Sequence, residues 1–122
     1  MLGFARRHRI GVDVEQVRDN MDVEGLAKRF FSANEFQVLH SLRAGQRTDA
    51  FFRGWTRKEA YLKARGEALS YGLDRVEVSL GPDEPPAILS ADDDPGVSQH
   101  WIVQQLLPAP GFIGAVAVEP AL

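Results

Sequence analysis

Residues 48–66 read TDAFFRGWTRKEAYLKARG and contain the strongest helical pattern in the chain. Apolar side chains recur there at three- and four-residue spacings, as in a helix that buries one face. They are Phe51, Phe52, Trp55 and Leu62. Thr48 or Asp49 is a suitable residue to cap the start of this helix, and Gly66 suits the left-handed position that follows a helix. We therefore predict a helix that ends near Arg65.

The residues that precede this helix predict one strand and two shorter helices. Residues 10–14 alternate in period two and are rich in β-branched side chains, which is typical of a strand. Residues 22–31 have apolar side chains at helical spacing. Ser32 and Glu35 form a capping-box pattern, so a second helix is expected over residues 33–42, with residues 44–46 at its end.

The residues that follow it predict only strands and turns. Strands are expected over residues 75–80, over residues 87–90, and in an antiparallel hairpin of residues 101–107 and 112–118. The order of one strand, three helices and then several strands predicts an α+β fold, in which a small antiparallel sheet packs against the helices. A length of 122 residues suits a single domain, residues 1–122.

The composition excludes several classes of function. The chain has no cysteine, which rules out disulfides, a zinc–thiolate site and a cysteine nucleophile, and which suits a cytoplasmic protein. No apolar run approaches the roughly 18 residues of a membrane helix, so no membrane partner is expected. The net charge of −3 argues against a nucleic-acid partner. The charge is unevenly distributed along the chain. Basic residues cluster in residues 5–9 and 53–65, and acidic residues cluster in residues 83–94. We interpret the acidic cluster as solvated surface.

Two carboxylates lie close together in the first predicted strand. Asp13 and Glu15 are two residues apart, so their side chains point to the same face of that strand. Neighbouring carboxylates repel each other, and a hard divalent cation such as Mg²⁺ removes that cost. The alternative is a solvated strand end with two ordinary acids.

A third carboxylate, Glu59, lies in the long predicted helix on the same face as Trp55 and Leu62. We therefore expect it to point towards the core, where acids are rare unless a cation accompanies them. Facing Asp13 and Glu15, it would complete a Mg²⁺ site and could activate a hydroxyl nucleophile.

Four segments in register resemble the phosphopantetheinyl transferase superfamily, most closely its two-lobed, surfactin-synthetase-activating type. They are Gly11-Val12-Asp13-Val14-Glu15, Arg29-Phe30-Phe31-Ser32-Ala33-Asn34-Glu35, Trp55-Thr56-Arg57-Lys58-Glu59-Ala60-Tyr61-Leu62-Lys63 and Gly66-Glu67-Ala68-Leu69-Ser70. The third is the most specific, and together they cover about residues 10–80.

The resemblance implies an enzyme that transfers the phosphopantetheine arm of coenzyme A to a serine of an acyl or peptidyl carrier protein. It implies that Asp13, Glu15 and Glu59 hold Mg²⁺ and that Glu59 helps to deprotonate the serine. It also implies that Lys63, and more weakly Lys58, hold phosphate oxygens of coenzyme A. The aromatic residues Phe30, Phe31 and Trp55 are expected to belong to the core.

The chain departs from the two-lobed pattern because only ten residues precede Gly11, where a whole lobe is expected. His8, His40 and His100 match no histidine of the pattern. Either the chain is a fragment of a longer protein, or one small lobe acts as an oligomer. A lone lobe would expose the surface that its partner covers, so we expect a homo-oligomer. Two other functions remain open: a truncated, non-catalytic lobe that binds a carrier protein or a partner lobe, for which the basic segment 53–65 would be an exposed docking surface, and an unrelated metal-dependent hydrolase.

Overall fold

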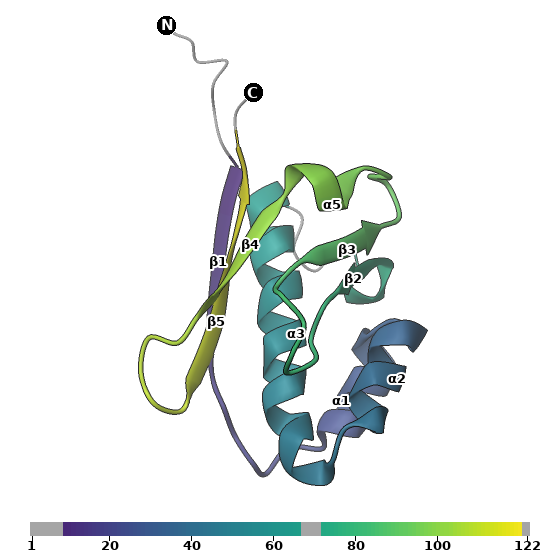
Figure 1. Cartoon of the computed structure of the whole chain (residues 1–122), viewed down its shortest axis with the longest axis vertical. Coiled ribbons are helices and arrows are strands. Elements are labelled where there is room, and N and C mark those ends of the chain that lie inside the picture. The colour runs from purple at the N-terminus through teal and green to yellow at the C-terminus, as the bar shows by residue number, and fades with distance from the viewer. Residues whose placement is uncertain (1–8, 67–71, 121–122) are drawn as a thin grey trace, which may run out of the picture.

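A long helix, α3 (Ala44–Arg65), forms the centre of the fold in the computed structural model, which describes residues 9–66 and 72–120. Figure 1 shows α3 lying along one face of a three-stranded sheet, with the two shorter helices and a small second sheet on its other side. Eleven of its residues are buried, because both of its sides are covered. The helix ends at Gly66, whose φ of 75° is the left-handed conformation that glycine adopts without strain.

The three-stranded sheet is antiparallel and has the order β1-β5-β4. Its strands are β1 (Arg9–Gln16), β4 (Ile102–Leu106) and β5 (Phe112–Glu119). Strand β1 lies directly against α3 at Gly11, where an added Cβ atom would stand 2.0 Å from the carbonyl oxygen of Ala60. Only glycine permits this approach, which brings the acidic part of β1 close to α3.

Two short helices, α1 (Val23–Phe30) and α2 (Ala33–Ser41), pack beside the first half of α3. The side chain of Asp22 caps α1 by accepting a hydrogen bond from the backbone N–H of Gly25. Ser32 and Glu35 form the predicted capping box at the start of α2. The apolar cluster between these helices includes Ala27, Leu39 and Phe51.

The second sheet consists of β2 (Val76–Val78) and β3 (Ile88–Ala91), which pair antiparallel. A 3₁₀ turn, η2 (Leu73–Arg75), precedes β2, and a single helical turn, α5 (Val97–His100), follows β3. These elements, the second half of α3 and the three-stranded sheet enclose a second apolar cluster, in which the rings of Tyr61 and Trp101 pack in a T-shaped arrangement.

The α+β architecture is as predicted, but three details of the sequence prediction are wrong. Residues 44–46 begin α3 rather than ending α2, because α2 stops at Ser41 and Arg43 serves as the N-cap of α3. The strands form two sheets instead of one. The turn α5 was not predicted, because four residues are too few to establish a helical period.

The basic segment 53–65 is not the exposed surface that the binding-module interpretation requires. Arg57 and Lys58 are almost fully buried, and Arg53 donates a hydrogen bond to the carbonyl oxygen of Leu80. The other predicted basic cluster, residues 5–9, lies outside the described residues apart from Arg9. Among the described residues, no helix combines the length and apolar character that a bilayer crossing needs.

Candidate active site

Asp13 and Glu15 project from the face of β1 that is turned towards α3. Burial alternates along the strand, with Gly11 and Asp13 buried and Val12 and Val14 exposed, as the period of two requires. Asp13 is only 5% exposed, whereas Glu15, nearer the end of the strand, is half-buried. The two carboxyl groups are close enough for Asp13 to raise the pKa of Glu15.

Glu59 and Lys63 approach this pair from α3. They are four residues apart, so they lie on the same side of the helix. Glu59 is 9% exposed, which confirms that it points inward. The ammonium of Lys63 donates a hydrogen bond of 2.7 Å to Oδ1 of Asp13. We call the group formed by Asp13, Glu15, Glu59 and Lys63 the carboxylate cluster. It contains three acids and one cation.

The carboxylate cluster holds an excess of negative charge in a partly desolvated place. Burial, and then the neighbouring Asp13 carboxyl group, raise the pKa of Glu15 from 4.5 to about 7, although Lys63 opposes this shift. The pKa of Glu59 is also raised, by burial first and then by the charge of Asp13. The hydrogen bond to Asp13 raises the pKa of Lys63, which keeps that ammonium charged. One lysine does not neutralise these acids, so the cluster favours a further cation.

The donor set fits Mg²⁺ better than a metal that requires a preformed protein cage. Among residues 9–66 and 72–120, no group of three His, Asp or Glu side chains is arranged to hold a metal ion. However, Oδ2 of Asp13 is buried and accepts no hydrogen bond. An orphaned carboxylate oxygen is costly without a cation. Mg²⁺ is commonly bound through one or two carboxylates, with water and substrate phosphates completing its shell.

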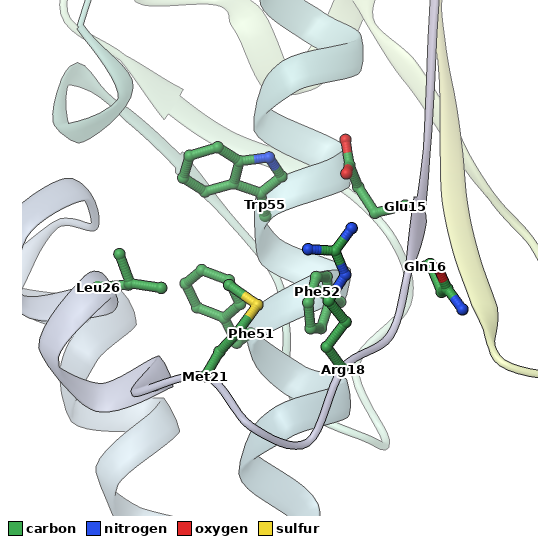
Figure 2. A pocket seen from close by; sticks show the side chains of 8 residues that line it. All are labelled: Glu15, Gln16, Arg18, Met21, Leu26, Phe51, Phe52 and Trp55. Carbon is green, nitrogen blue, oxygen red and sulfur yellow. The ribbon is translucent and has the colours of Figure 1, made fainter.

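A pocket of about 210 Å³ adjoins the carboxylate cluster at Glu15 (Figure 2). Its polar rim includes Arg18, which lies on the segment that follows β1. Its walls are apolar and come from α1, α3 and the segment before α1; they are Met21, Leu26, Phe51, Phe52 and Trp55. Trp55 is thus only partly a core residue, because it also forms a wall of a pocket next to the acids.

The structure does not bring Lys58 to the carboxylate cluster. Its side chain is fully buried, and its ammonium lies 2.6 Å from Oε1 of Glu35. It also donates hydrogen bonds to the carbonyl oxygens of Leu73, at 2.6 Å, and Val76. All three ammonium donors are therefore occupied inside the protein, and Lys58 cannot reach a phosphate in this conformation.

Sequence reasoning identified Glu35 as a helix cap but missed it as the partner of Lys58. Its Oε1 accepts the N–H of Ser32, and its Oε2 accepts the N–H of Val78 at 2.6 Å. The sequence could have indicated this pair, because buried charges of opposite sign on neighbouring helices tend to pair. The pocket residues Arg18 and Met21 were also missed, and no periodicity marks them.

The remaining candidates lie elsewhere. His40 pairs with Glu24 at 2.7 Å, and His100 with Asp94 at 3.2 Å, both at exposed positions. The fourth segment of the family pattern, residues 66–70, lies outside the described residues apart from Gly66.

Comparisons with known proteins all point to one family. The family model of the 4'-phosphopantetheinyl transferase superfamily matches residues 9–117. The chain is 41% identical over 109 residues to the 4'-phosphopantetheinyl transferase HetI of Nostoc sp., covering 89% of this chain and 43% of that protein. It is 40% identical over 101 residues to a putative 4'-phosphopantetheinyl transferase of Synechocystis sp., covering 83% of this chain and 39% of that protein. The chain therefore spans less than half the length of these curated relatives.

Among solved structures, the fold resembles holo-(acyl-carrier-protein) synthases. One is the holo-(acyl-carrier-protein) synthase of Bacillus anthracis, determined in complex with coenzyme A (3',5'-ADP), with a TM-score of 0.69 and 22% identity. That similarity covers 93% of this chain and 96% of the other. The family match over nearly the whole chain, together with the fold, establishes that this chain belongs to the 4'-phosphopantetheinyl transferase superfamily.

Proposed function

We propose that this chain is the catalytic lobe of an enzyme that transfers the 4'-phosphopantetheine arm of coenzyme A to a serine of an acyl or peptidyl carrier protein. The observation that carries the proposal is the junction of β1 and α3, where Lys63 donates a hydrogen bond to Asp13 and where the charges of Glu15 and Glu59 also act on its ammonium. A site of this kind suits phosphoryl-type transfer, which depends mainly on positioning and on neutralising charge.

In the proposed reaction, the serine hydroxyl attacks the β-phosphorus of the diphosphate in coenzyme A. An O–P bond to the serine forms, the bond between that phosphorus and the bridging oxygen breaks, and 3',5'-ADP leaves. Glu59 takes the serine proton, directly or through water, and its raised pKa brings it closer to the pH at which a general base works well. Lys63 holds oxygens of the diphosphate as charge develops on the leaving group.

Mg²⁺, held by Asp13, Glu15 and Glu59, would supply neutralising charge for the diphosphate. The unpartnered Oδ2 of Asp13 and the excess of acids over cations support this assignment. The apolar pocket beside Glu15 is suitably placed for the uncharged part of the pantetheine arm, because that arm must extend from the reacting phosphorus.

We also propose that the outer face of the three-stranded sheet is covered by a second copy of this chain or by a partner lobe. Ile10, Val12 and Val14 of β1 and Ile102 of β4 are all exposed on that face. Neighbouring exposed apolar side chains commonly mark an interaction surface. Light scattering tests self-association, and a monomer at high concentration contradicts the homo-oligomer.

Intact mass spectrometry of the carrier tests the function. The chain is mixed with coenzyme A, Mg²⁺ and a panel of apo carrier domains, with Glu59→Gln as the matched variant. We expect a gain of the phosphopantetheine mass on a carrier, reduced about a hundredfold or more in the variant. Carriers that stay unmodified while coenzyme A and Mg²⁺ bind would instead support a non-catalytic lobe; an equally active variant would contradict the role of Glu59.

A further inference from the structure

The three lysines of this chain occupy three different environments. Lys58 is buried in a complete set of partners. Lys28 is exposed on α1. Lys63 lies between these extremes, because its side chain is 47% exposed while the Asp13 side chain that it contacts is only 4% exposed. Lys63 can therefore swing into solvent by changing side-chain rotamers, whereas Asp13 is fixed within the sheet.

Lys63 and a divalent cation would be attracted by the same three carboxyl groups. The charges that raise the pKa of Lys63 belong to Asp13, Glu59 and Glu15, which are the three acids that we propose to hold Mg²⁺. In the structure, Oδ1 of Asp13 accepts a hydrogen bond from the Lys63 ammonium, and Oδ2 of Asp13 has no partner. An ammonium and a divalent ion on one carboxylate repel each other strongly in a partly desolvated site. The two cations therefore cannot share Asp13 without cost.

We infer that Lys63 is a resident counter-ion of the metal-free site, displaced from Asp13 when a divalent cation binds and thereby released to hold a phosphate of the nucleotide. This role rests on the proposed function and adds to it an exchange of cations that links metal entry to phosphate binding. The ammonium offsets part of the charge of the acids when no metal is present. Once displaced, it remains on α3, four residues from Glu59 and beside the diphosphate that it would bind.

The exchange makes a prediction opposite to that of a simple supporting role. If Lys63 only shaped the site, its removal would weaken or not affect metal binding. If it competes, removal of its charge strengthens metal binding and weakens nucleotide binding. The size of such a coupling between two ligands is commonly about 5- to 150-fold.

The experiment measures Mn²⁺ affinity of the nucleotide-free chain from the electron paramagnetic resonance signal of the free ion. We expect Lys63→Met to bind Mn²⁺ about tenfold more tightly than the wild type. Lys63→Arg, which keeps the positive charge, should retain the wild-type affinity. Lys28→Met removes one lysine charge from an exposed site and should also leave it unchanged, which controls for net charge. Asp13→Asn should abolish the binding, which identifies the site.

A second titration, with 3',5'-ADP at saturating Mn²⁺, should show weaker binding by Lys63→Met and unchanged binding by Lys28→Met. Equal or weaker Mn²⁺ affinity of Lys63→Met, or no Mn²⁺ binding by any variant, overturns the inference. Failure of the proposed function is distinguishable, because carriers would then stay unmodified while Lys63→Met still binds Mn²⁺ more tightly. Carriers that gain the phosphopantetheine mass while all variants bind Mn²⁺ equally would keep the function and reject the exchange.

Discussion

Lys58 and Glu59 are adjacent on α3, yet their surroundings differ in a way that separates structure from chemistry. Lys58 has a carboxylate partner and two carbonyl acceptors, and both oxygens of that carboxylate accept backbone hydrogen bonds as well. Glu59 faces two further acids that share one lysine, and an oxygen of Asp13 is left without a partner. Successive helical residues are about 100° apart around the axis, which allows one helix to serve both environments.

The role of a charged residue in a motif therefore depends on the charges and hydrogen bonds around it, and its identity in the sequence is not enough to assign that role. A buried ion pair with complete hydrogen bonding needs no ligand, so the Lys58–Glu35 pair fastens α3 to α2 and β2. A cluster with excess charge and an orphaned oxygen is unstable by itself, which is the usual mark of a binding or catalytic site.

The largest effect is expected from breaking the Lys58–Glu35 pair. Lys58→Met leaves the Glu35 carboxylate buried without its cation, so we expect a loss of about 3–5 kcal/mol in the free energy of unfolding. Urea denaturation measures this loss. The double variant Lys58→Met with Glu35→Gln, which removes both charges, should recover part of it.

The same variant also tests whether Lys58 shares in the chemistry that we assign to Glu59. If Lys58→Met were as stable as the wild type but bound coenzyme A more weakly, Lys58 would have the phosphate role that its burial argues against.

A smaller effect is expected from Gly11→Ala, which tests the close approach of β1 to α3. The new methyl group would overlap the backbone of Ala60 and Ala64, so β1 must move away from α3. We expect a cost of about 1–3 kcal/mol in unfolding free energy, measured by denaturation, and weaker Mg²⁺ binding by calorimetry. Gly45→Ala is the matched control, since a Cβ atom at that helical position meets nothing within 4 Å. Unchanged metal binding by Gly11→Ala would show that the carboxylate cluster does not depend on this approach.

The smallest effect is a pH dependence from Glu15. Its pKa is about 7 in the folded chain and near 4.5 when unperturbed, so the folded state binds the proton more tightly. Stability of the metal-free chain should therefore fall as pH rises from about 4.5 to 7. In Glu15→Gln this contribution disappears, and the thermal midpoint should depend less on pH over that window. Parallel pH profiles for the two proteins would contradict the raised pKa.

Local patterns predicted most of the fold and most of the acidic residues of the site. The period of two in β1 placed Asp13 and Glu15 on one face, and the helical period placed Glu59 inward. These inferences held because they depend only on backbone geometry.

The residues that the sequence did not place depend on contacts between distant segments. The position of Lys58 is decided by carbonyl oxygens of Leu73 and Val76, which lie 15 and 18 residues away and form no recognisable pattern. The start of α3 was also missed, because Gly45 is a poor helix former and suggested a helix end.

Paramagnetic broadening by Mn²⁺ in the amide NMR spectrum tests where the metal binds, because one titration reports on both sides of α3. We expect signals from residues 13–15 and 59–63 to broaden first, while those of Ser32, Glu35 and Val78 persist. Broadening centred on the acidic residues 92–94, or on the Glu35 side of α3, would contradict the assignment of the metal to the carboxylate cluster.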